Sequence, residues 1–183
     1  TLVKRFPQHE NTPQHLLSAA VCYERVNDRK NSLRVYHKLI KRYSADLRHN
    51  KLVFTALARS IEIYKHNKNK RSATRTRKRM IKEYKARNLH PGGPEASFVA
   101  QAEFELIEDQ YQRFLALKIS GSMKAQGKAI KQIKDEVRSL SDSYSRVVKY
   151  NAPEWTIASL YRLGRLEQSF AQRLYELPIP PEY

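Results

Sequence analysis

The sequence predicts an all-α protein, an α-solenoid of helix pairs followed by a long antiparallel helical hairpin. Apolar residues recur at spacings of three and four along most of the chain, whereas no alternating run of Val, Ile or Thr bounded by turn residues predicts a strand. Two glycine-containing stretches, "NLHPGGPEA" and "KISGSMKAQ", divide the helical segments. A shift of 41 residues also aligns one part of the chain with another, which is typical of stacked helical repeats.

The first helix is expected to begin at Thr12 and Pro13, because Thr is a favourable N-cap and Pro fits the first helical turn. Its apolar face consists of Leu16, Ala19, Ala20 and Tyr23. A second helix is expected from about Asn31, and the short link "NDRKN" makes the two helices antiparallel neighbours. Cys22 is expected to be a small core residue, and as the only cysteine it cannot form an internal disulfide.

The second helix pair repeats the first at the 41-residue shift. The matched positions are Leu16 with Leu57, Tyr23 with Tyr64, Ser32 with Ala73, Leu39 with Met80, Ile40 with Ile81 and Tyr43 with Tyr84. The hexamer "KLIKRY" aligns with "RMIKEY". Residues 12–90 are therefore predicted to form two degenerate helix pairs that bury these apolar side chains in a shared interior.

Residues 95–150 are predicted to form a long hairpin of a different kind. Apolar residues step by three and four along both of its helices, so each helix has a narrow apolar seam. A last helix is predicted within residues 151–178, packed on the hairpin and ended by "PIPPEY". These segments and the two helix pairs are expected to form one elongated domain.

An acidic cluster flanks the seam of the first hairpin helix and comprises Glu103, Glu105, Glu108 and Asp109. A pair of carboxylates can act in acid–base catalysis. The expected arrangement is instead a solvated acidic edge that pairs with basic residues of the facing helix. Those basic residues are Lys128, Lys131, Lys134 and Arg138.

The chain is strongly basic, with 35 Lys and Arg, 18 Asp and Glu and a net charge of +17, which favours anionic partners. Residues 65–87 hold eleven Lys or Arg and one acid, Glu83. In the second helix of the second pair, Arg77 is expected on the inner face, and the outward cations are candidate contacts for a partner. The candidates are Lys70, Arg71, Arg75, Lys78, Arg79, Lys82, Lys85 and Arg87.

Three interpretations of this basic face remain open. The first is a solvated surface without a partner, and the second is a docking surface for an acidic protein or an anionic envelope polymer. The third is a nucleic-acid-binding surface. The sequence has no helix-turn-helix or RNA-module signature, and Tyr64 and Tyr84 are expected in the core rather than on a base-stacking platform. These two observations favour a protein partner over nucleic acid.

The first helix pair resembles a tetratricopeptide repeat, a family that places apolar, small and aromatic residues at fixed offsets in a helix–turn–helix. The matching positions are Leu16, Ala19, Ala20, Tyr23, Ser32, Tyr36, Leu39 and Ser44. The second pair matches less well, because Ile61 and Arg77 replace the expected small and aromatic residues and its spacing exceeds the usual 34. Generic α-solenoid families remain possible.

The C-terminal outline "PEW…A…YR.G…E.FA..LY..P.PPE" resembles a segment of tetratricopeptide-type proteins from the gliding-motility and envelope machineries of Gram-negative bacteria. This resemblance implies a scaffold in the bacterial cell envelope or periplasm. A cytoplasmic location is the alternative.

No arrangement of nucleophile, base, metal ligands or phosphate-binding loop predicts an enzyme or a cofactor. No apolar run approaches the roughly 20 residues of a membrane-spanning helix. We therefore expect a non-catalytic scaffold or adaptor that binds proteins with acidic surfaces on the concave face of its stacked helices. The alternative is a basic helical-repeat protein that binds nucleic acid or another anionic polymer.

Overall fold

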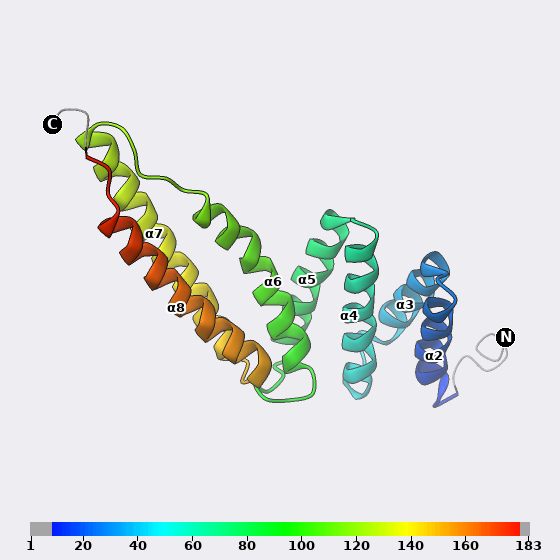
Figure 1. The fold of residues 1–183 in the computed structure, drawn as a ribbon. Helices are drawn as coiled ribbons and strands as arrows, with labels where there is room; N and C mark the ends of the chain where they lie inside the picture. The colour runs from blue at the N-terminus through cyan, green and yellow to red at the C-terminus, as the bar shows by residue number, and fades with distance from the viewer. Residues whose placement is uncertain (1–8, 180–183) are drawn as a thin grey trace. The chain divides into compact units, whose positions relative to one another are not determined.

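The computed structural model describes residues 9–179, and every regular element in this range is a helix, which confirms the all-α prediction. The described elements are α2 (Thr12–Arg25), α3 (Arg29–Tyr43), the short 3-10 helix η1 (Leu47–His49), α4 (Asn50–His66), α5 (Lys70–Ala86), α6 (Ala96–Leu115), α7 (Met123–Val148) and α8 (Pro153–Tyr175) (Figure 1).

The chain divides into two compact units, where the sequence predicts one domain. Unit 1 consists of Thr1–Leu89 and Gly93–Val99, and unit 2 consists of His90–Gly92 and Ala100–Tyr183. The division falls within α6, whose first turn buries Ala96 and Val99 as part of unit 1.

Unit 1 contains two helix pairs, α2 with α3 and α4 with α5, and α3 also packs against α4. The four aliphatic residues predicted to form its interior are at most 4% exposed: Leu16, Leu39, Leu57 and Met80. The two tyrosines predicted beside them, Tyr23 and Tyr64, are half-buried. The four aliphatic positions are therefore buried in both pairs, and the two pairs meet where α3 packs against α4.

The 41-residue shift also relates the two turns in backbone detail. Asn27 and Lys68 both have a left-handed backbone, with φ values of 58° and 55°, and equivalent backbone hydrogen bonds surround them. The next residue, Asp28 or Asn69, caps the following helix by accepting a hydrogen bond from the N–H three residues later, at 3.1 and 3.0 Å. Helices α3 and α5 consequently begin at equivalent positions.

Cys22 is exposed, so the prediction that it is a core residue is wrong. It follows the fully buried Ala20 by two residues on α2. Two residues correspond to about 200° around an α-helix, which places the thiol on the opposite face.

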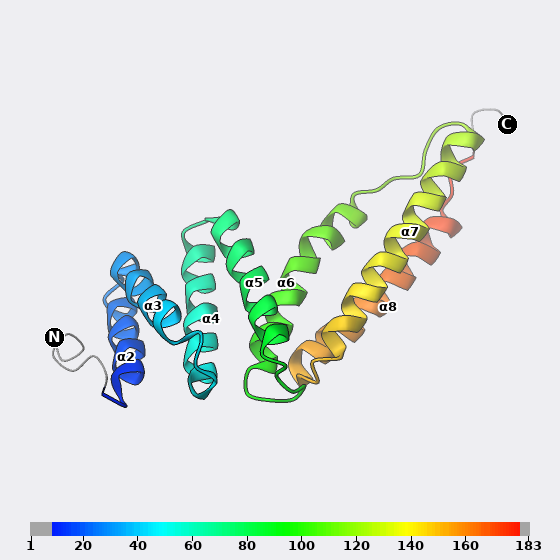
Figure 2. The ribbon, with the colours of Figure 1, turned by 180° about the vertical axis from the view of Figure 1, so that it is seen from behind.

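Unit 2 is built from α7, α8 and the part of α6 that follows Val99. Helices α7 and α8 lie side by side, and theirs is the closest backbone packing in this unit (Figure 2). Helix α6 contacts them through long side chains, including Phe104, whose ring lies 5.5 Å from that of Tyr144 and 5.4 Å from that of Trp155. The sequence predicts the tight hairpin between α6 and α7, whereas the closer backbone pair is α7 with α8.

Two members of the acidic cluster have partners other than the expected basic residues. The Tyr144 hydroxyl donates to Glu108 at 2.6 Å, and Arg162 of α8 donates to the same carboxylate at 2.9 and 2.6 Å. Glu103, 9% exposed, accepts hydrogen bonds from the Tyr150 hydroxyl and from Arg146. Because α6 and α7 run antiparallel, the early part of α6 meets the late part of α7, where none of the expected lysines lies.

Candidate functional site

The positive charge of the chain is concentrated in unit 1. The sequence of this unit has 23 Lys and Arg and 7 Asp and Glu, so its net charge is 23 − 7 = +16 of the total +17. Unit 2 has 12 Lys and Arg and 11 Asp and Glu, a net of 12 − 11 = +1. A candidate surface for an anionic partner therefore lies on unit 1.

Helix α5 presents most of the predicted contact residues to solvent. Its inner face buries Ala73, Met80 and Tyr84, while Arg77 is half-buried there, as expected from its position. The outer face exposes seven of the eight candidates, namely Lys70, Arg71, Arg75, Lys78, Arg79, Lys82 and Lys85. The eighth candidate, Arg87, lies elsewhere.

Arg87 is not an outward cation, because its side chain is only 4% exposed. Its guanidinium donates to Glu83 at 3.0 Å, to the Asn50 side chain and to the Ser44 carbonyl, and it lies 5.7 Å from the centre of the Phe54 ring. These contacts connect the end of α5 to the end of α3 and the start of α4. Arg87 therefore has a structural role and is removed from the candidate surface.

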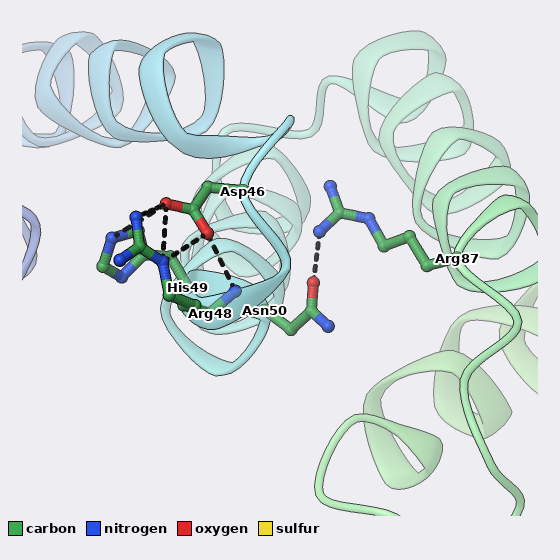
Figure 3. A network of polar contacts seen from close by, with 5 residues as sticks. All are labelled: Asp46, Arg48, His49, Asn50 and Arg87. Atoms are coloured by element: carbon green, nitrogen blue, oxygen red, sulfur yellow. Dashed lines mark hydrogen bonds and ion pairs between the residues drawn. The ribbon is translucent and has the colours of Figure 1, made fainter.

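Figure 3 shows Arg87 directed at Asn50, beside a second polar group at the start of α4. There, Asp46 accepts hydrogen bonds from the Arg48 side chain and backbone N–H, which lower the pKa of its carboxyl to about 2. His49 lies 3.7 Å from the same carboxylate. This cluster lies in the link between the two helix pairs, and its Asp46 carboxylate is paired with Arg48.

A second basic stripe lies on α3, and the sequence analysis did not identify it. We name the exposed cations of the two helices the α3 stripe and the α5 stripe. The α3 stripe consists of Lys30, Arg34, Lys38 and Lys41, and the α5 stripe of Arg71, Arg75, Arg79 and Lys82. Each member of the α5 stripe follows its counterpart in the α3 stripe by 41 residues. In both stripes the cations are spaced by 4, 4 and 3 residues, which places them within roughly 80° of the helix circumference. The 41-residue alignment that matches the apolar residues of the two helix pairs also matches these cations.

A pocket of about 310 Å³ lies between α3, α4 and α5, and both Arg75 and Arg79 of the α5 stripe line it. The Tyr64 hydroxyl and His37 Nε2 are 3.0 Å apart at its wall. Burial, followed by the positive charges of Arg79 and Arg75, lowers the pKa of His37 below its usual value. The imidazole is consequently neutral at pH 7, and the two guanidinium groups provide the charge of the pocket.

This arrangement can attract and hold an anion, since Arg donates to carboxylate and phosphate oxygens in a planar fork. Among residues 9–179, no group of three or more His, Cys, Asp and Glu side chains is placed to hold a metal ion. Within the same range, no helix combines the length and apolar character that crossing a bilayer requires.

Comparisons with protein-family models, with curated proteins and with solved structures found no match to this chain.

Proposed function

We propose that the chain is a non-catalytic scaffold or adaptor that binds a protein partner with an acidic surface through unit 1. The observation that supports this proposal is the pair of in-register basic stripes on α3 and α5, within a unit of net charge +16. A fixed array of exposed cations accelerates the encounter with an acidic surface and selects against basic ones.

The proposal includes a tetratricopeptide-like stacking of the helix pairs. In the first pair, Ala20 and Ser32 are fully buried, which fits the close helix crossing that small residues permit in such repeats. The likeness of the C-terminal segment to envelope proteins supports a location in the bacterial envelope or periplasm, with a cytoplasmic location as the alternative.

The test is a binding titration of the purified chain with a fluorescently labelled Glu-rich peptide and with its Gln-rich counterpart. Charge reversal to Glu is made at four cations of α5, namely Arg75, Lys78, Arg79 and Lys82. The matched control reverses four exposed lysines of α7 in unit 2, namely Lys124, Lys128, Lys131 and Lys134. The α5 variant is expected to lose binding and the α7 variant to retain most of it. Equal losses in both would show that only the total charge matters and would refute a docking surface on unit 1.

Nucleic acid is the second candidate partner, because the two basic stripes are also compatible with a phosphate backbone. A phosphate backbone laid across α3 and α5 would meet cations on both helices. In that case single-stranded DNA would outcompete the Glu-rich peptide, and its affinity would fall steeply with salt on a log–log plot.

A further inference from the structure

The pocket between α3, α4 and α5 differs from the rest of the basic surface because apolar residues lie beside cations in its lining. Arg75 and Arg79 stand one helical turn apart at its side. Ile40 and Leu57, which are 2% and 1% exposed, belong to its lining. A flat cationic surface would attract an anion by charge alone. This pocket also has room for the methylene groups of a ligand.

The polar groups of the pocket differ in how far they are already engaged. The hydroxyls of Ser60 and Thr76 donate to backbone carbonyls of their own helices, at 2.7 and 2.9 Å. Arg79 forms an exposed ion pair with Glu83 at 3.5 Å, a contact of little energetic weight. Among the described residues, Arg75 has no hydrogen-bond or ion-pair partner. Its guanidinium is the donor that remains free for a ligand.

The size of the pocket limits what can enter it. Pockets for small molecules occupy about 300–1,000 Å³, and a volume of about 310 Å³ lies at the lower end of this range, with room for one amino-acid side chain. A side chain that fits the lining needs a short aliphatic stem and an anionic end. Glutamate has both, with its carboxylate matched to the guanidinium fork.

We propose that this pocket is the anchor for a glutamate side chain of the bound partner. The carboxylate accepts hydrogen bonds from Arg75 and Arg79, and the methylene groups lie within the pocket, whose lining also includes Tyr64 and Thr76. The inference rests on the proposed function and specifies its partner chemistry: an acidic polypeptide segment with one Glu inserted and further acidic residues along the stripes.

The experiment compares two substitutions that remove the same charge from the same stripe. Arg75→Gln alters the pocket, and Arg71→Gln removes an exposed cation one turn earlier, outside the pocket lining. With the Glu-rich peptide as probe, we expect about a tenfold loss of affinity for Arg75→Gln and about a twofold loss for Arg71→Gln. A third variant, Thr76→Phe, fills the pocket without changing the charge and is expected to weaken binding about as much as Arg75→Gln. Circular dichroism establishes that each variant is folded.

If Arg75→Gln and Arg71→Gln weaken binding equally and Thr76→Phe has no effect, the proposal of a glutamate-binding pocket is refuted. The proposal of an acidic protein partner is not affected by that result. Failure of the unsubstituted chain to bind the Glu-rich peptide overturns both. If a phosphopeptide or an oligonucleotide, rather than the Glu-rich peptide, depends on Arg75 and Thr76, the pocket exists and its assignment to a carboxylate is overturned.

Discussion

Replacing Arg87 by alanine is expected to lower the free energy of unfolding of unit 1 by about 3 kcal/mol. The substitution removes a nearly buried guanidinium and leaves three acceptors without their donor, in Ser44, Asn50 and Glu83. Ser44 and Asn50 are only half-buried, so water partly replaces the lost donor and each acceptor costs about 1 kcal/mol, the low end for such groups. Glu83, 26% exposed, loses its nearer cation and adds a similar amount.

Arg79→Ala is the matched control, because Arg79 pairs with the same Glu83 from an exposed position. Its side chain is 47% exposed and its contact is 3.5 Å long, so the expected loss is under about 0.5 kcal/mol. Arg87→Lys keeps the charge but cannot reach all three acceptors, and it is expected to lie between the two alanine variants.

Native-state hydrogen exchange measures these effects, with amides of α4 and α5 reporting on unit 1 and amides of α7 as an internal reference. The protection of α4 and α5 is expected to fall far more in Arg87→Ala than in Arg79→Ala. If both variants lose protection equally, the buried network does not stabilise unit 1 as described.

Three smaller predictions concern the turn between α4 and α5 and the pocket. Lys68→Gly is expected to raise the free energy of unfolding by about 0.5 kcal/mol, because glycine adopts the left-handed φ of 55° without steric cost; an unchanged or lower urea midpoint would contradict this. Asn69→Ala removes the cap of α5 and is expected to cost about 1 kcal/mol by the same assay, whereas Asn69→Ser should restore most of it. His37 faces Tyr64 of α4 and Arg75 and Arg79 of α5, and its pKa is lowered in the folded chain. As the pH drops, the unfolded chain therefore binds a proton at His37 before the folded chain does. The free energy of unfolding is expected to fall as the pH drops below about 6.5. His37→Gln should reduce that loss between pH 7 and pH 5, and an unchanged pH profile would show that His37 is not its source.

The sequence was sufficient to predict the helices and the interior of unit 1, because a buried helix face imposes a period on its apolar residues. Leu16, Leu39, Leu57 and Met80 follow that period, and the structure buries all four. The same period continues through α6 without interruption, so it gave no indication that the chain divides after Val99. The first turn of α6 belongs to unit 1 because of its contacts with residues distant in the sequence, which local periodicity does not show.

The candidate surface was predicted only in part, because the sequence shows charge but not exposure. Lys85 and Arg87 are both cations at the end of α5, yet only Lys85 reaches solvent. The α3 stripe went unnoticed because its cations are spread among apolar residues rather than gathered in one run. The pocket combines side chains from three helices, and its position follows from their packing rather than from local spacing.

Unit 1 has a net charge of +16 and unit 2 a net charge of +1, so the electric field that an approaching polyanion meets originates almost entirely from unit 1. At physiological ionic strength this field extends only about 8 Å from the surface of unit 1. Its influence on the encounter rate is therefore strongest in dilute buffer and decreases as salt is added.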